Sequence, residues 1–370
     1  MKINALALQN FKNYENLALE FTEGIQLFLG QNGMGKTNLL DALHYLTFTK
    51  TAFVNTDNQN IRKGALYFLV KGDFENDGQT HEVICYHELR KKKVIKLNGS
   101  PYDRIIEHIG KLPLVLSTPY DSDLIREISE VRRKWVDGCI AQYNQEYLAD
   151  LMVYNRILSQ RNALLKGMEG HLKASNELLL DTYDTQLITL SKSLSHVRAD
   201  FVDKFVPFLS ANEGLIVFEH ETCSMTYQSQ ILAGDFEHTF LESRKKDLLT
   251  LRTNVGSHKD DYSFLMDGQP LKKFGSQGQQ KSFLIALRLS QYDYLAKATQ
   301  TKPMLLLDDI FDKLDDERIG RLTDLLSDSA RFGQVFITDA RKERSSLLMK
   351  GKHNAKIFEI ENGKVNSYET

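Results

Sequence analysis

Residues 30–37 read GQNGMGKT and directly follow the apolar run IQLFL. The spacing fits the pattern G-x-x-x-x-G-K-[ST]. The run before it predicts a strand, and the following TNLLDALHYLTF predicts a helix. Glycines allow the loop to curl so that its N–H groups point at phosphate oxygens, and the helix N-terminus adds partial positive charge. The stretch therefore predicts a phosphate-binding loop (P-loop), with a chance glycine-rich turn as the alternative.

Two polar residues of this loop have expected roles. Lys36 is expected to reach the β- and γ-phosphates of ATP, and the Thr37 hydroxyl is expected to bind Mg²⁺. The predicted nucleotide-binding residues are Gly30, Gln31, Asn32, Gly33, Met34, Gly35, Lys36 and Thr37.

Besides Thr37, a P-loop needs a carboxylate on a neighbouring strand to hold the metal. The segment KPMLLLDDIFDKLD, beginning at residue 302, supplies it. The run from Met304 to Leu307 is typical of a parallel strand that is buried on both faces. Asp308 would end that strand and bind Mg²⁺ directly or through water. Asp309 would orient or deprotonate the attacking water. The alternative is a pair of acids that merely begins a surface loop.

The segment KKFGSQGQQKSFLIALRLSQYDYLA, residues 272–296, opens with small and amide residues and continues as an amphipathic helix. Such a helix start is a further anion-binding N-terminus. Because one P-loop already satisfies its own phosphates, this start is expected to contact the ATP of a second copy. An ordinary N-capped core helix is the alternative. The predicted trans contacts are Ser276, Gln277, Gly278 and Gln279.

Composition limits the class of protein. The chain has 370 residues, a net charge of −2 and 42% hydrophobic residues, as expected for a globular protein with about two domains. The near-neutral charge means that any contact with a polyanion must be local. Three widely separated cysteines indicate neither a zinc site nor a disulfide framework. With no signal-peptide core at the N-terminus, we expect a cytoplasmic protein.

The ATPase motifs are divided between the two ends of the chain, so a discontinuous head is expected from residues 1–136 and 250–370. Apolar residues at three- and four-residue steps predict two antiparallel helices in a lobe over residues 137–249. The turn between them is placed at KGMEGHLKAS, residues 166–175. Three β-rich runs between residues 66 and 99 predict consecutive antiparallel strands.

Two basic clusters are candidates for contact with DNA phosphates. Lysines in the first are also typical of a solvated strand edge, and arginines in the second could instead pair with nearby acids. The candidate DNA-binding residues are Lys91, Lys92, Lys93, Lys96, Arg132 and Arg133.

The three motifs, in this order, resemble those of the ATP-binding-cassette (ABC) ATPases. GSQGQ stands in the place of the signature loop of that superfamily, and KLDDERI, residues 313–319, resembles its D-loop. In GQVFITDAR, Thr338 and Asp339 stand where the switch histidine is usual, so the γ-phosphate sensor is left open. The implied fold is α/β: an ABC-type P-loop ATPase head, with a mixed sheet and an antiparallel β subdomain, plus a short helical lobe.

A closer resemblance is to the RecF family of bacterial recombination mediators. It rests on four stretches: LQNFKNYENLALEF near the N-terminus; STPYDSDLI with EVRRKWVD, residues 117–137; YNRILSQRNALLK, residues 154–166; and GSHKDDYSFLMDGQPLKKFGSQGQQKS, residues 256–282. In the last stretch, Ser257 and Lys259 replace the usual proline and arginine. The short helical lobe also separates the chain from SMC proteins and Rad50, whose coiled coils are far longer.

The resemblance implies a weak, DNA-stimulated ATPase that dimerises on Mg²⁺-ATP. It also implies binding to duplex DNA and strand junctions without sequence specificity, and loading of recombinase at single-strand gaps with RecR-like and RecO-like partners. The residues alone leave two rivals open. One is a P-loop phosphotransferase of metabolism, and the other is a scaffold that binds ATP without turnover.

Overall fold

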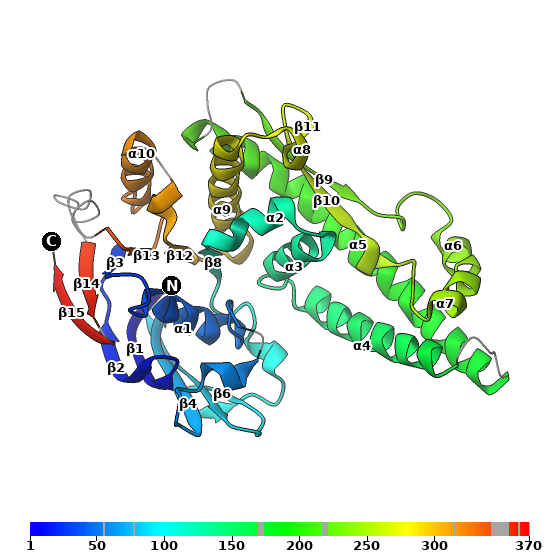
Figure 1. Cartoon of the computed structure of the whole chain (residues 1–370), viewed down its shortest axis with the longest axis horizontal. Coiled ribbons are helices and arrows are strands. Elements are labelled where there is room, and N and C mark those ends of the chain that lie inside the picture. Colours follow the sequence, from blue (N-terminus) through cyan, green and yellow to red (C-terminus); the bar gives the residue numbers. More distant parts are fainter. Residues whose placement is uncertain are drawn as a thin grey trace. The chain divides into compact units, whose positions relative to one another are not determined.

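A computed structural model of the chain describes residues 1–54, 56–76, 78–168, 174–216, 221–313, 316–341, 355–361 and 363–369. The chain divides into two compact units (Figure 1). Unit 1 is drawn from residues 1–121, 215–217 and 281–370, and unit 2 from residues 122–214 and 218–280.

The boundaries between these units, near residues 121 and 280, differ from the expected boundaries at residues 136 and 250. The difference has a physical reason, because helix α3 (Ser129–Ile140) packs against strand β10 (Asp261–Met266) within unit 2. The predicted turn between the two long helices falls partly on residues 169–173, which lie outside the described residues.

Unit 1 contains two six-stranded sheets. The antiparallel sheet has the order β2-β1-β4-β5-β6-β7. Its strands are β1 (Lys2–Phe11), β2 (Tyr14–Glu20), β4 (Tyr67–Asn76), β5 (Gln79–Glu88), β6 (Val94–Leu97) and β7 (Ser100–Pro101). The other sheet has the order β15-β14-β3-β13-β12-β8 and is parallel except for β15. Its strands are β3 (Ile25–Leu29), β8 (Leu114–Ser117), β12 (Met304–Asp308), β13 (Val335–Asp339), β14 (Ala355–Glu361) and β15 (Lys364–Glu369).

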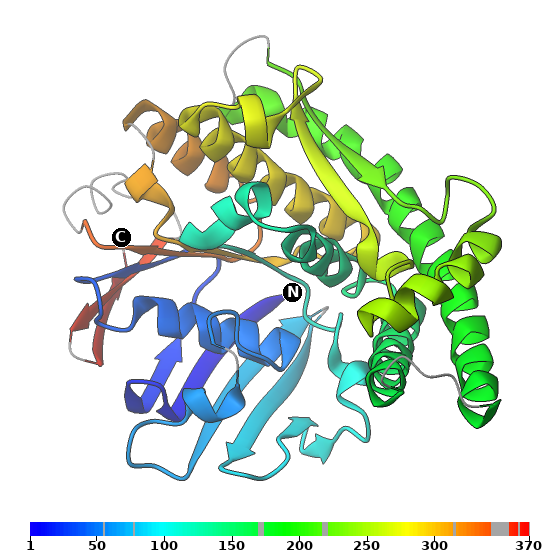
Figure 2. The same ribbon diagram turned by 45° about the vertical axis from the view of Figure 1, so that its right-hand side comes forward.

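Helix α1 (Lys36–Phe48) occupies the space between these two sheets (Figure 2). Its apolar side chains share one core with Phe28 and Phe336 of the parallel sheet and with Phe68 and Phe74 of the antiparallel sheet. Every residue of β3, β12 and β13 is buried, and for β12 this confirms the burial predicted from the run Met304–Leu307. This packing fixes the start of α1, and therefore the P-loop, at the carboxyl end of β3.

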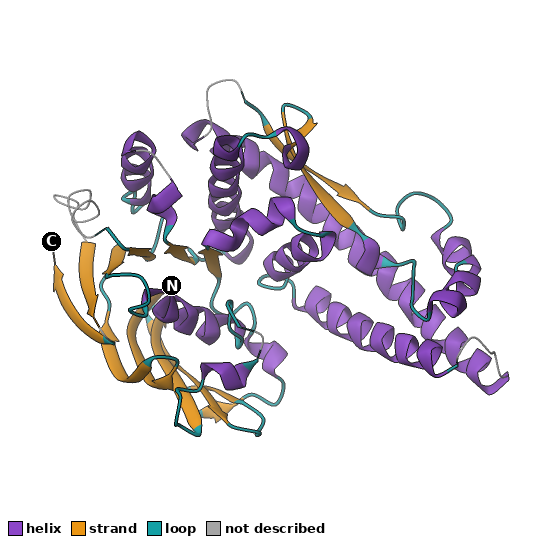
Figure 3. Cartoon of the chain, in the orientation of Figure 1, coloured by secondary structure: helices purple, strands orange, loops and turns teal. Residues whose placement is uncertain are grey.

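Unit 2 is mainly helical, with a small sheet of order β11-β10-β9 (Figure 3). Its elements are α2 (Ser122–Arg126), α3, α4 (Gln145–Gly167), α5 (Ala174–Ile216), β9 (Cys223–Gln228), α6 (Phe236–Glu242), α7 (Arg244–Thr250), β10, β11 (Gln269–Pro270) and α8 (Leu271–Phe274). Helix α9 (Gln277–Thr299) begins in unit 2 and continues into unit 1, which also contains α10 (Asp316–Leu326). In the described ranges, no helix combines the length and the apolar character needed to cross a bilayer.

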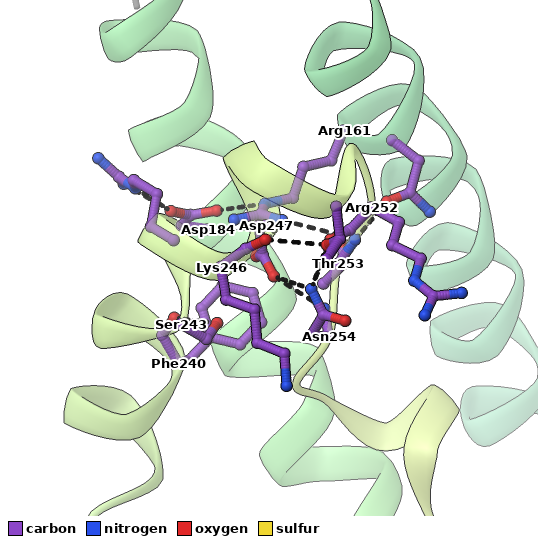
Figure 4. A network of polar contacts seen from close by, with 12 residues as sticks. Arg161, Asp184, Phe240, Ser243, Lys246, Asp247, Arg252, Thr253 and Asn254 are labelled. Carbon is purple, nitrogen blue, oxygen red and sulfur yellow. Dashed lines mark hydrogen bonds and ion pairs between the residues drawn. The ribbon is translucent and has the colours of Figure 1, made fainter. Parts of the chain in front are cut away.

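Buried ion pairs connect the long helices of unit 2. Arg161 on α4 donates to Asp184 of α5 (2.6 Å) and to Asp247 of α7 (2.7 Å), and all three side chains are almost completely buried (Figure 4). Arg198 on α5 similarly pairs with Asp137 of α3 and with Asp260. Because the aspartates come from four separate segments, these arginines hold α3, α4, α5 and α7 together.

Candidate nucleotide site

The P-loop has the backbone that its sequence predicts. Gly33 and Gly35 adopt φ angles of +83° and +111°, a region that favours glycine, and Gly35 is the N-cap of α1. The Lys36 ammonium lies over the loop, where it donates to the carbonyl oxygens of Gly30 (2.7 Å) and Gln31 (3.0 Å). Burial lowers the pKa of Lys36, while Asp309, Asp308 and Asp339 act in the opposite direction.

A carboxylate faces the loop from the end of β12. The Thr37 hydroxyl donates to the two Asp308 oxygens at 2.9 and 3.1 Å, across 271 residues of sequence. Burial raises the pKa of Asp308, whereas hydrogen bonds from Thr338 and Thr37 lower it. The donor set consists of a carboxylate and hydroxyl groups, which are hard oxygen ligands of the kind that Mg²⁺ prefers. These residues therefore fit a magnesium ion.

Thr338, in the position left open as γ-phosphate sensor, joins the two neighbouring aspartates. Its hydroxyl donates to Asp308 Oδ1 (2.7 Å) and accepts from the backbone N–H of Asp309 (2.9 Å). Asp309 has a φ of +50°, which is uncommon for a residue with a side chain. The hydroxyl of Thr338 thus helps to hold the strand end in a conformation in which Asp309 acts electrostatically on Lys36.

Residues near the N-terminus support the loop from outside. Asn13 donates to the Met34 carbonyl (3.1 Å), and Tyr14 donates to the Gly35 carbonyl (3.1 Å). A Cβ atom at Gly35 would lie 2.8 Å from the Tyr14 hydroxyl, so a side chain cannot be added there without displacing the tyrosine. The sequence alone does not indicate this contact, because 21 residues separate the NFKNY stretch from its partners in the loop.

The predicted trans contacts lie in unit 2, at the start of α9. Ser276 and Gln279 form a reciprocal capping box: the Ser276 N–H donates to Gln279 Oε1 (2.7 Å), and the Gln279 N–H donates to Ser276 Oγ (3.2 Å). Ser276 and Gln277 are exposed, whereas Gly278 and Gln279 are half-buried. The D-loop assignment at residues 313–319 includes residues 314 and 315, which lie outside the described residues.

The candidate DNA-binding residues differ in exposure and in their partners within the fold. Lys91, Lys92 and Lys96 are exposed, and Lys91 pairs with Glu88. Arg133 is half-buried and donates to the Ser129 hydroxyl and the Asp260 carbonyl.

Two further candidates have ionic partners within the fold. Lys93 pairs with Asp57 (3.1 Å) and donates to the Thr49 carbonyl, so its ammonium connects the residue before β6 to the segment after α1 within unit 1. Arg132 is buried and forms a two-pronged pair with Asp261 at 2.8 and 3.0 Å. Pairing with nearby acids, the alternative considered for the arginine cluster, therefore describes Arg132.

Comparisons with known proteins agree with this geometry. The family model described as "RecF/RecN/SMC N terminal domain" matches residues 2–366. A protein named "DNA replication and repair protein RecF" from Cytophaga hutchinsonii is 43% identical, covering 99% of this chain and 96% of its own. A protein of the same name from Flavobacterium johnsoniae is 40% identical, covering 97% and 100%.

Solved structures give the same result. "Structure of the recombination mediator protein RecF-ATPrS in RecFOR pathway" matches with a TM-score of 0.89 and 29% identity, covering 100% of this chain and 98% of that one. A head domain of Smc from Pyrococcus furiosus matches with a TM-score of 0.57 at 17% identity, covering 99% and 96%, which is a likeness of fold alone. The predicted ABC-type ATPase fold is confirmed by these structures.

Proposed function

The chain belongs to the RecF family, and from that premise we propose that it is an ATP-dependent mediator of recombinational repair and replication. In this role it would bind Mg²⁺-ATP, dimerise, bind DNA and help to load recombinase at single-strand gaps. The RecF proteins among its relatives are named for DNA replication and repair, and one matching structure is described as RecF-ATP in the RecFOR pathway. RecR-like and RecO-like partners and a cytoplasmic location are part of the proposal.

One observation carries the proposal, namely the approach of Thr37 and Asp308 from distant parts of the chain. The P-loop amides and Lys36 would hold the β- and γ-phosphates, with Thr37 and Asp308 as the residues that hold the metal. When bound, Mg²⁺ neutralises charge on the phosphate oxygens. Residues 30–37 supply N–H groups and a positive helix end at the same place.

For hydrolysis, we assign Asp309 as the residue that orients water or accepts its proton. Its carboxylate is one methylene shorter than a glutamate would be, which is consistent with weak turnover. Thr338 fixes the backbone of Asp309 through the 2.9 Å hydrogen bond to its N–H. DNA stimulation of this activity is a further part of the proposal.

Substitution of the two aspartates should give different defects. Asp308→Asn should weaken Mg²⁺ binding, because it removes the charged metal ligand. Asp309→Asn should leave ATP bound but slow hydrolysis by about 10²–10⁴-fold, the usual contribution of a general base. Equilibrium binding of ATP with graded Mg²⁺, together with single-turnover phosphate release, measures both effects. Equal loss of ATP binding in both variants would refute this division of roles.

The proposed dimer places the start of α9 against the ATP of the second copy. ATP would then bind the dimer more tightly than the monomer and shift assembly by mass action. Ser276 is exposed and lies at the helix N-terminus, so a larger cation there would block the approach of the partner.

Light scattering with ATP, with ADP and without nucleotide tests the proposed function. The wild-type chain should double its mass only with ATP, and Ser276→Arg should stay monomeric while still binding ATP. Thr182→Arg, at an exposed position of α5, is the matched control and should dimerise normally. A wild-type chain that binds ATP and stays monomeric would instead favour a metabolic phosphotransferase.

A further inference from the structure

A cationic pocket lies in unit 2, in a part of the fold without P-loop or signature residues. Its volume is about 390 Å³, within the range of small-ligand sites. The walls come from α3, α4, α5 and the turn before β10. The lining includes Arg133, Lys134, Asn155, Arg198, His258 and Lys259.

Most of the charge around this pocket is already paired. Arg198 is bound by Asp137 and Asp260 at 2.9 Å, and Lys134 pairs with Glu130 at 2.6 Å. Arg133 and Lys259 are different, since no described carboxylate lies within ion-pair distance of either. The net charge of the pocket is therefore about +1, when Arg133, Lys134, Arg198 and Lys259 are counted against Glu130, Asp137 and Asp260.

Both ring nitrogens of His258 have hydrogen-bonding partners within the fold. His258 Nδ1 lies 2.7 Å from the Tyr154 hydroxyl, and His258 Nε2 lies 3.1 Å from the Thr253 carbonyl. Burial lowers the pKa of His258 to about 4, so this ring contributes no positive charge to the pocket near neutral pH. The exposed Asn155 and Lys259, with half-buried Arg133, remain to contact a ligand.

The positive charge extends beyond the pocket. Burial lowers the pKa of Lys259, and Arg252, Arg133 and Lys246 lower it further. Lys246 and Arg252 are exposed, and Figure 4 shows their side chains extending from the segments that also carry the buried Asp247 and Thr253. A ligand that touches Lys259 thus meets further cations along the surface, which suits a repeating anion better than a single one.

We propose that this pocket binds a phosphate of the DNA backbone through Arg133, Asn155 and Lys259, an inference that rests on the proposed DNA-binding function. A chain of net charge −2 can attract DNA only through such local clusters. The contact carries no base-specific group, so it would position the duplex without reading its sequence.

The first test measures DNA binding by the full chain with ATP over a range of salt concentrations. Lys259→Gln should weaken binding about tenfold, as expected for loss of one charge-assisted contact. It should also reduce the slope of log K against log salt by about 0.9, one phosphate on duplex DNA. Arg133→Gln should act similarly, and the exposed Lys259 keeps the test valid if that variant does not fold.

The matched control is Lys204→Gln, which removes one exposed positive charge from α5 in the same unit. Its affinity and salt slope should equal those of the wild type. If Lys259→Gln also binds like the wild type, the pocket inference is wrong while DNA binding itself stands. If the wild type binds no DNA, the proposed function fails, and this inference fails with it.

The second test measures acylation of Lys259 by an amine-reactive reagent, read by mass spectrometry. The Lys259 side chain is exposed, and a bound phosphate should cover its amine and raise its pKa. Duplex DNA should therefore protect Lys259. Protection by inorganic phosphate or polyglutamate at equal ionic strength, with none by DNA, would overturn the assignment to DNA.

Discussion

Arg161→Ala should destabilise unit 2 by about 3–5 kcal/mol, because the buried Asp247 would lose the charge that balances it and Asp184 would keep only Arg244. The Arg161 side chain has no exposed surface, and it also donates to the Thr253 hydroxyl at 2.8 Å. Trp135 is the single tryptophan of the chain and lies in unit 2, so denaturant unfolding followed by its fluorescence reports on this unit.

Arg156→Ala is the control, because Arg156 is exposed on the same helix and should change stability by no more than about 0.5 kcal/mol. A compound variant, Arg161→Met with Asp184→Asn and Asp247→Asn, should recover much of the lost stability. Replacing a buried ionic group as a whole is far less costly than breaking it. If Arg161→Ala unfolds at the same denaturant concentration as Arg156→Ala, the network does not hold the helices together.

Lys36→Ala should weaken ATP binding by about 1.5–3 kcal/mol, roughly 10- to 150-fold, since it removes a charge-assisted contact to the terminal phosphates. Lys36→Arg keeps the charge but places a larger group where the ammonium now contacts the Gly30 and Gln31 carbonyls. It should therefore recover only part of the affinity.

Calorimetric titration with ATP and Mg²⁺ measures this effect. Lys63→Ala is the matched control, because it removes an exposed lysine of unit 1 and should leave the affinity unchanged. Wild-type affinity in Lys36→Ala would show that residues 30–37 are not the nucleotide site.

The candidate nucleotide site could be proposed from the sequence because its parts are short local patterns. The run before Gly30 predicts a strand and the run before Asp308 predicts a buried parallel strand, and parallel strands present their carboxyl ends at one edge of a sheet. The structure places Thr37 and Asp308 together at that edge. The strands expected between residues 66 and 99 are also present, as β4, β5 and β6.

The interior of unit 2 could not be predicted in the same way. The apolar spacing of α4 and α5 indicated buried stripes, and Tyr154 and Leu187 are indeed buried. The spacing of apolar residues does not show which charged residues are buried, however. The sequence therefore does not distinguish Arg161 from an arginine that is exposed to solvent. Its partner Asp247 is 86 residues away in the sequence. Only the folded chain shows that this pair is internal.

The position of β3 in its sheet affects how the protein can fold during synthesis. Both neighbours of β3 are late strands, β13 on one side and β14 on the other. A nascent chain emerging from the ribosome can pair β1, β2 and β4 early, but β3 has no partner until residues 335–361 are made. Such long-range pairing is slow, and an unpaired apolar strand is prone to aggregation. The P-loop would therefore be completed only near the end of translation, and a chain truncated before residue 335 would have no intact nucleotide site.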